Sequence, residues 1–221
     1  IQGNLLVDYL LGAEVHFAAD VHEQRTMLDH LAADVRAGGG RPHILNDNPM
    51  FDVASAVAYL EVTLEIVEQL DALGKTPDCI YMSSSGKGQA GMILAQKLLD
   101  LRFAMHGVTA TDEFHIPSRT ATIANQTSTA IGLDVTVDEK DVVNFDNFVG
   151  EGYGIPSEAG NEAVRLFART EGIILDPIYT GKAAAGLVAH VREGRFASDD
   201  VVVFVHTGGT PAIFTWNELW L

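Results

Sequence analysis

The sequence has one cysteine, few basic residues and no long apolar run, and each of these shortages excludes a class of protein. With Cys79 as the only cysteine among 221 residues, no disulfide framework can form, and we expect a buried structural thiol. No apolar run approaches the roughly 20 residues that a membrane-spanning helix needs, and no signal-peptide pattern opens the chain. Lys and Arg number 14 against 30 Asp and Glu, a formal net charge of -16, which argues against nucleic acid or anionic lipid as a partner. We therefore expect a cytoplasmic protein that binds neither nucleic acid nor membrane.

The chain carries enough apolar residues, 47% of its 221, to fold as one large domain or two small ones. Short apolar runs alternate with segments of helical periodicity. We expect strands at 14–18, 43–46, 78–82, 103–108 and 201–205, and helices at 4–11, 21–37, 52–73, 92–101, 117–131, 158–169 and 182–192. The expected helix caps are Asp20, Ser157, Thr180 and Gly172. Strands separated by helices of this length predict a parallel sheet with crossover helices, hence a layered α/β fold.

Two further features of the chain bear on its sites. The eight histidines show no spacing typical of a metal centre, so the sequence predicts no metal site. The segment 138–154 is acidic and rich in glycine, which is typical of a long functional loop or of a passage between subdomains.

The stretch "SSSGKGQAG" (83–91) joins an expected strand to an expected helix. A glycine-rich turn in that position binds phosphate because its backbone N–H groups can close on the anion and the helix dipole favours negative charge there. Its last six residues fit the dinucleotide pattern G-x-G-x-x-G, and Asp112 follows Gly91 by 21 residues, near the place where a ribose-binding acid belongs. The Walker pattern is excluded because Gly88 follows Lys87, where Ser or Thr must bind Mg²⁺. A dinucleotide, another phosphate and a turn without any ligand remain open.

A second glycine-rich turn, "HTGGTP" (206–211), follows the last expected strand. A dinucleotide enzyme does not need this turn. An enzyme that surrounds one small phosphorylated cofactor from several strand ends would use both turns, so the pair favours the second kind of ligand.

Three ordered motifs resemble those of one enzyme family. They are "GYGIP" (152–156), "EGIILDPIYTGKAAAGL" (171–187) and "VVVFVHTGGTPAIF" (201–214). Together they are similar to the D-cysteine desulfhydrase and 1-aminocyclopropane-1-carboxylate deaminase family, over essentially the whole chain. The resemblance implies dependence on pyridoxal 5'-phosphate (PLP), a small amino-acid substrate and a homodimer. It also implies the tryptophan-synthase β-subunit type of fold (PLP fold type II), a three-layer structure with an open, twisted, mostly parallel sheet and helices on both faces.

Under this resemblance "SSSGKGQAG" matches the loop that holds the PLP phosphate. The residues implied for the phosphate cup are Ser84, Ser85, Gly86, Lys87, Gly88 and Gln89. The family usually has small or hydroxyl residues where this chain has Lys87 and Gly88. The Lys87 ammonium could pair with phosphate, point to solvent or meet an acidic group of the substrate, and the sequence leaves all three open.

Tyr153 and Tyr179 match the two active-site tyrosines of the family. A phenol beside a bound amino acid can move a proton or hold a carboxylate, provided that its neighbours lower its pKa from about 10. Aromatic packing in the core is the alternative for either residue alone.

Thr180 and Thr207 match the hydroxyl residues expected near the pyridine nitrogen of PLP. In the deaminase branch of the family a glutamate follows the tyrosine that corresponds to Tyr179, and its charge makes the ring a stronger electron sink. The desulfhydrase branch has threonine there, as this chain has. Threonine also suits a helix N-cap, so a structural role for Thr180 stays open.

The lysine that binds PLP covalently has no counterpart among the five lysines of this chain. The resemblance places it N-terminal to Ile1, so we expect the chain to be the C-terminal part of an enzyme that does not complete the catalytic cycle alone. Residues 1–48 would then be the remainder of a smaller lobe and 49–221 the large PLP-binding domain.

The resemblance implies a β-eliminating lyase, in the first place a D-cysteine desulfhydrase that releases pyruvate, ammonia and sulfide. L-Cysteate sulfo-lyase and 1-aminocyclopropane-1-carboxylate deaminase are alternatives within the family. From other classes, an NAD-dependent dehydrogenase rests on the G-x-G-x-x-G pattern alone, and a non-catalytic relative of the PLP enzymes would account for the missing lysine.

Overall fold

The computed structural model describes residues 1–45 and 49–221, and its contacts divide the chain into two compact units, Ile1–Phe51 and Asp52–Leu221. The first unit contains α1 (Gly3–Leu10) and α2 (Val21–Ala37). Asp20 caps α2 as predicted, since its carboxylate accepts a hydrogen bond from the N–H of Glu23 at 2.8 Å.

The strands predicted at 14–18 and 43–46 are wrong for the residues that the structure describes, and Asn46 lies outside them. Residues 14–18 and 43–45 have no strand pairing. A short apolar run forms a strand only where a second strand bonds to it, and the described part of this unit supplies none.

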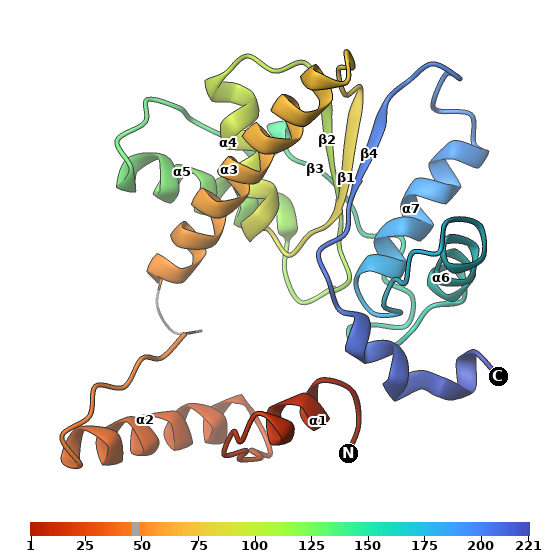
Figure 1. The fold of residues 1–221 in the computed structure, drawn as a ribbon. Coiled ribbons are helices and arrows are strands. Elements are labelled where there is room, and N and C mark those ends of the chain that lie inside the picture. Colours follow the sequence, from red (N-terminus) through yellow and green to blue (C-terminus); the bar gives the residue numbers. More distant parts are fainter. Residues whose placement is uncertain (46–48) are drawn as a thin grey trace. The chain divides into compact units, whose positions relative to one another are not determined.

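The second unit is built on a parallel sheet with the strand order β3-β2-β1-β4 (Figure 1). The strands are β1 (Cys79–Ser83), β2 (Ala104–Val108), β3 (Val143–Phe145) and β4 (Val202–Val205). The helices are α3 (Pro49–Ala72), α4 (Lys87–Leu98), α5 (Ile116–Ala130), α6 (Glu158–Glu171) and α7 (Thr180–Arg192), with 3-10 helices η1 (Glu139–Asp141) and η2 (Thr210–Leu219). In Figure 1 helices α3, α4 and α5 lie on one side of the sheet and α6 and α7 on the other. The predicted α/β fold with helices on both faces is therefore confirmed.

The two faces of β1 carry different cores. Ile80 and Met82 point to the aliphatic core shared with α4 and α5. Cys79 and Tyr81 point to the opposite face, where Ala183 of α7 packs against them. Because both faces are covered, the strand is apolar throughout instead of alternating, which is why its sequence predicts a buried strand.

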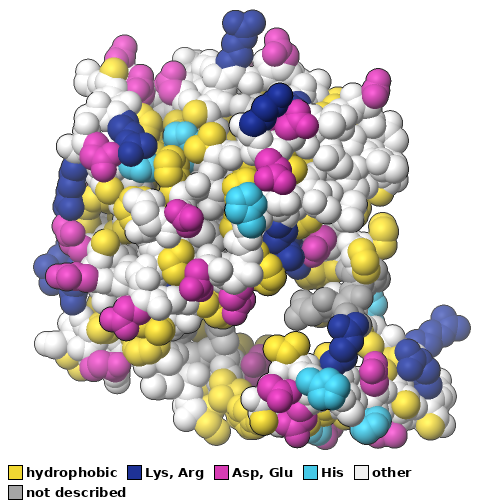
Figure 2. Space-filling model, turned by 180° about the vertical axis from the view of Figure 1, so that it is seen from behind, with side chains coloured by type: hydrophobic (Ala, Val, Ile, Leu, Met, Phe, Trp, Pro, Cys, Tyr) yellow, Lys and Arg dark blue, Asp and Glu magenta, His cyan; other side chains and the backbone are white. Residues whose placement is uncertain are grey.

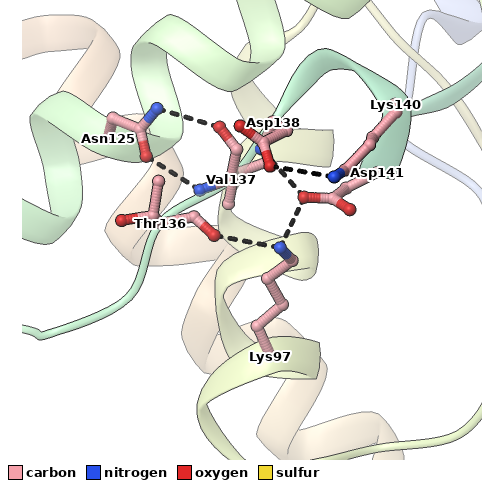
Figure 3. A network of polar contacts seen from close by, with 7 residues as sticks. All are labelled: Lys97, Asn125, Thr136, Val137, Asp138, Lys140 and Asp141. Atoms are coloured by element: carbon pink, nitrogen blue, oxygen red, sulfur yellow. Dashed lines mark hydrogen bonds and ion pairs between the residues drawn. The ribbon is translucent and has the colours of Figure 1, made fainter.

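A polar network ties α4 and α5 to the segment that leads to β3 (Figure 3). Lys97 of α4 donates to the carbonyl of Thr136 at 2.9 Å and pairs with Asp141. Asn125 of α5 exchanges two 2.9 Å hydrogen bonds with the backbone of Val137. Asp141 also caps η1 by accepting from the N–H of Asp138 at 2.8 Å. The acidic residues of this segment thus fix a loop at the protein surface.

The ends of α6 follow the sequence prediction. Ser157 accepts a hydrogen bond from the N–H of Gly160 at 3.1 Å, and Gly172 ends the helix with a φ of 68°.

On the face of the molecule in Figure 2, acidic side chains (magenta) are scattered among hydrophobic and basic ones. Among the described residues, no helix is long and apolar enough to cross a membrane.

Candidate functional site

A cavity of about 570 Å³ opens at the carboxyl ends of β1, β2 and β4. The chain runs from β1 outward to β2 and β3 and returns to place β4 on the other side of β1. Parallel α/β sheets bind ligands at such a change of direction, because the loops there diverge to opposite faces. The described residues that line the cavity are Ser55, Tyr59, Met82, Ser83, Ser84, Ser85, Lys87, Gly88, Ala110, Thr111, Glu113, Phe114, Tyr153, Tyr179, Thr207, Gly208 and Gly209.

The loop after β1 presents an open helix N-terminus to this cavity. Gly86 is the N-cap residue of α4, and no side chain caps the helix there. Its φ of 103° is a conformation that side chains other than glycine rarely adopt. The first-turn N–H groups of α4 are therefore available to an anion, which the helix dipole also attracts.

Gly88 lets the loop lie close to α3 and β1. A Cβ at this position would stand 2.8 Å from Cε of Met82 and 3.1 Å from two ring carbons of Tyr59. The Tyr59 ring, which also lines the cavity, thus occupies the space that a side chain at 88 would need. Burial raises the pKa of Tyr59, so this phenol is neutral and can donate a hydrogen bond.

Ser84 and Gln89 support the loop from inside the protein. The Ser84 hydroxyl donates to Oε1 of Gln89 at 2.8 Å and accepts from the N–H of Gly86 at 3.2 Å. The amide of Gln89 donates to the carbonyl of Val143 on β3 at 2.8 Å. Ser84 lines the cavity, whereas the Gln89 side chain is fully buried and engaged with its neighbours.

Lys87 lies on the cavity wall with its ammonium 2.6 Å from Oδ1 of Asp52, a residue of α3. Arg119 of α5 approaches Oδ2 of the same carboxylate at 3.4 Å and donates to the carbonyl of Ser85 at 3.1 Å. The ion pairs of Lys87 and Arg119 with Asp52, and the hydrogen bond of Arg119 to Ser85, therefore hold the loop against α3 and α5. The structure thus adds Asp52 as a partner of Lys87, and a pairing of its ammonium with phosphate or with an acidic group of the substrate stays a prediction.

Tyr153 and Tyr179 meet at the cavity, with their hydroxyl oxygens 2.6 Å apart. Tyr153 is 49% exposed and Tyr179 38%, so a molecule in the cavity can reach both. Burial, and next the hydrogen bond to Tyr153, raises the pKa of Tyr179 above that of a free phenol. The lowered pKa that a phenolate base would need is therefore absent at Tyr179, and its phenol is neutral.

The carboxylate of Asp176 caps the N-terminus of α7. It accepts hydrogen bonds from the N–H groups of Ile178 (2.8 Å), Tyr179 (2.7 Å) and Thr180 (2.9 Å) and from the Thr180 hydroxyl (2.6 Å). Thr180 is the first helical residue, so the prediction that it caps a helix from 182 is wrong in detail. Its hydroxyl is buried against Asp176 and lies outside the cavity lining.

Thr207 is exposed and lines the cavity, so its hydroxyl is within reach of a ligand there. The neighbouring His206 is structural: Nε2 lies 3.0 Å from the carbonyl of Ile174, and Nδ1 accepts from the N–H of Gly208 at 3.2 Å. Asp112, considered as a ribose ligand, lines a different cavity with Asn144 and Asp146.

Sequence reasoning missed several residues of the site. Tyr59 and Asp52 come from a helix without a motif, and only the fold brings them to the loop. Thr111 and Glu113 lie just after β2, where the polar run "TATDE" after an apolar strand could have indicated them. Asp176 stands inside a recognised motif, and its place four residues before Thr180 is the available signal of a cap.

The comparison with protein families decides among the phosphate ligands. Residues 1–208 match the family model "Pyridoxal-phosphate dependent enzyme". The chain belongs to this family. PLP is therefore the cofactor of the family to which the loop belongs, and the dinucleotide alternative is set aside.

Solved structures share the fold of this chain. An "ACC deaminase homologue" shares 26% sequence identity and a TM-score of 0.83, over 99% of this chain and 66% of that one. The processed form of threonine deaminase isoform 2 from Solanum lycopersicum matches with 15% identity and a TM-score of 0.58, over 98% of this chain and 62% of that one. O-ureido-L-serine synthase matches with 16% identity and a TM-score of 0.56, over 99% of this chain and 62% of that one. The chain thus spans about two thirds of the length of these proteins.

The residues of the cavity fit PLP. The glycine cradle at 86 and 88 leads into an uncapped helix N-terminus, which suits the phosphate. The volume of about 570 Å³ lies in the range of small-molecule sites, roughly 300–1,000 Å³. Hydroxyl donors stand around the remainder of the cavity, at Ser83, Thr111, Tyr153, Tyr179 and Thr207.

Proposed function

We propose that the chain forms the cofactor-binding part of a PLP-dependent β-eliminating lyase of the D-cysteine desulfhydrase type. The overall reaction converts D-cysteine and water to pyruvate, ammonia and hydrogen sulfide. The observation that carries the proposal is the phenol pair Tyr153–Tyr179, which faces the same cavity as the phosphate loop.

The uncapped N-terminus of α4 would hold the phosphate of PLP, with Ser85 and Gly86 in the cradle and Lys87 beside it. PLP, when bound, withdraws electrons from the amino acid and makes its Cα–H acidic. Thr207 reaches the cavity from β4 and is the better placed of the two threonines to meet the pyridine nitrogen. A contact between Thr180 and that nitrogen remains a prediction.

The phenol pair can supply a proton. In a pair with oxygens 2.6 Å apart, one O–H donates to the other phenol, whose own O–H is left for an acceptor in the cavity. Because burial raises the pKa of Tyr179, this phenol stays protonated at neutral pH. We propose that the pair donates to the departing sulfur, which leaves more easily as hydrogen sulfide than as an anion.

Two related reactions are alternatives. Deamination of 1-aminocyclopropane-1-carboxylate is favoured by the likeness to the 26% identical ACC deaminase homologue and disfavoured by threonine at 180. Elimination of sulfite from L-cysteate is favoured by the cation Lys87 on the cavity wall, although Asp52 offsets its charge.

The test is turnover by the full encoded protein loaded with PLP. D-Cysteine should give pyruvate and sulfide, and replacing either tyrosine by Phe should lower kcat about 100-fold while PLP remains bound. Sulfite from L-cysteate or 2-oxobutyrate from the cyclopropane substrate would select an alternative instead. If PLP binds and none of the three substrates reacts, the lyase assignment is wrong.

A further inference from the structure

Lys182 is a lysine buried without a charged partner beside it. Its side chain is 0% exposed, although it is the third residue of α7 and lies only three positions from Tyr179. Its ammonium donates a hydrogen bond to the carbonyl of Gly152 at 3.0 Å. Among the described residues, no carboxylate forms an ion pair with it, and the carboxylates of Asp112 and Asp176 act on it only from a distance.

A buried ammonium group at this position destabilises the folded protein. Burial lowers the pKa of Lys182, and the two distant carboxylates offset only part of that effect. Buried charges are ordinarily paired with an opposite charge, and an aliphatic side chain would fill the same space without the penalty. The residues around it in α7 are small and apolar, Ala183, Ala184 and Ala185, so the packing of the helix does not require a lysine.

The partner of Lys182 is a loop with little conformational preference of its own. Residues 150, 152 and 154 are glycines with φ angles of 74°, 151° and 76°. Such a loop has many accessible conformations, so contacts from outside must select the one observed. Tyr153, in the middle of the loop, is half exposed and gains its position from two contacts, the Lys182 bond to Gly152 and its own bond to Tyr179.

Both contacts come from one turn of α7. Tyr179 stands at the N-cap of the helix and Lys182 one turn further on, so the two side chains reach the glycine loop from the same side. The first contact holds the Tyr153 hydroxyl and the second holds the backbone immediately before it. Neither contact alone would fix both the position and the direction of the phenol.

We propose that Lys182 is a positioning residue, a tethered cation that binds the Gly152 carbonyl and thereby keeps Tyr153 paired with Tyr179 at the cavity. Its effect on the loop is independent of the reaction, whereas its effect on catalysis rests on the function proposed above.

The test uses Lys182→Met in the full encoded protein, because Met keeps most of the volume and removes the donor. Lys97→Met is the matched control, since Lys97 also donates to a backbone carbonyl, that of Thr136, in a network that contains neither tyrosine (Figure 3). Hydrogen exchange of the backbone N–H groups within 150–156, which Pro156 lacks, should become about tenfold faster in Lys182→Met, while α4 and α5 keep their protection. Lys97→Met should leave 150–156 unchanged and loosen only 136–141.

The catalytic part is tested by a double-mutant cycle with Tyr153→Phe. Lys182→Met alone should lower kcat about 10- to 100-fold, because misplacing a reacting group by about 1 Å has effects of that size. In the Tyr153→Phe background it should lower kcat less than about threefold, since the phenol that it positions is already gone. Equal losses in both backgrounds would show a general structural effect and overturn the proposal.

If the Met variant does not fold, Lys182→Gln serves, because its shorter amide keeps a donor and should give intermediate exchange at 150–156. A folded variant of either kind with unchanged exchange at 150–156 overturns the proposal. If the wild-type protein turns over no substrate, the proposed function fails, while the exchange experiment still decides the role of Lys182.

Discussion

Two helices of the second unit, α4 and α7, begin at the same cavity, and their first turns are completed in opposite ways. The first turn of α4 starts at Gly86, which offers no capping side chain. The first turn of α7 is closed by the buried carboxylate of Asp176, which accepts from three N–H groups. The positive end of α7 is therefore already neutralised, and that of α4 is left for the ligand.

This difference separates two tasks within one cavity. The α4 terminus can bind an anion because no side chain of its N-cap residue occupies it, and the loop that precedes it is held by Lys87, Asp52 and Arg119. The α7 terminus cannot take a second anion beside Asp176. Its residues Tyr179 and Lys182 instead bond to the hydroxyl of Tyr153 and to the carbonyl of Gly152 in the glycine loop.

The largest expected effect comes from removing the carboxylate that caps the N-terminus of α7. Asp176→Ala should lower the free energy of unfolding by about 3–5 kcal/mol, because it leaves several buried donors without an acceptor. Urea denaturation measures the change. The control is Ser157→Ala at the cap of α6, which loses a single bond and should cost about 1 kcal/mol. Equal losses for the two variants would remove the distinction between α7 and an ordinary capped helix.

Acid should destabilise the protein through His106, which contacts Cys79 and Tyr81 on the face of the sheet that α7 covers. Burial, and next the charge of His190, lowers the pKa of His106 to about 4, below its value of about 6.5 in an unfolded chain. Between these values the unfolded chain binds the proton and the folded one does not, so stability falls as the pH falls from about 6.5 to 4. The loss should be about 3 kcal/mol, since one pKa unit corresponds to about 1.36 kcal/mol.

The groups that face His106 determine this behaviour. Cys79 lies 3.1 Å from its Nδ1, the rings of Tyr81 and Phe145 pack against it, and Arg195 opposes a further positive charge. Urea titrations at several pH values give the slope of the free energy of unfolding against pH. This slope should be smaller in His106→Asn, whereas replacing the exposed His30 by Asn should leave it unchanged. An unaltered slope in His106→Asn would place the acid sensitivity elsewhere.

A smaller effect is expected from Gly86, where a side chain would strain the loop. Gly86→Ala should lower the free energy of unfolding by about 1–3 kcal/mol, because its φ of 103° suits glycine alone and the new Cβ would meet Arg119 at 3.2 Å. Gly172→Ala is the control, with a φ of 68° and open space around it, so about 1 kcal/mol is expected there. Only the first change should weaken PLP binding.

The smallest effect is expected away from both termini. Lys97→Met removes a partly exposed ion pair with Asp141, and such pairs contribute about 0–1 kcal/mol. A loss well above that range in urea denaturation would mean that the network of Figure 3 holds the sheet together instead of a surface loop.

The sequence predicted the parallel core well because its strands are buried on both faces and read as apolar runs. The strand predicted at 78–82 is β1, the one at 103–108 is β2, and the one at 201–205 is β4, each within a residue or so. It missed β3, whose three residues include Asn144, because that strand exists only through its pairing with β2. The false strands at 14–18 and 43–45 show the reverse case, apolar runs without a strand to bond to.

The site was predictable only in part. The loop at 83–91 could be read from local chemistry, since glycines and hydroxyls between a strand and a helix indicate a phosphate site. The two tyrosines are 26 residues apart, so the resemblance to a family, and not their spacing, brought them together. Asp52, Tyr59 and Lys182 could not be found in this way, because each is polar or aromatic on a helix and acquires its role from a contact across the fold.

The central claim is that the α4 terminus, and not the α7 terminus, binds the phosphate of PLP. The most direct measurement compares the affinities of PLP and pyridoxal, which lacks the phosphate, in the wild-type protein, Gly86→Val and Asp176→Asn. The wild-type protein should prefer PLP strongly. That preference should fall at least about tenfold, or about 1.4 kcal/mol, in Gly86→Val and persist in folded Asp176→Asn. A preference that survives in Gly86→Val and disappears in Asp176→Asn would contradict the account.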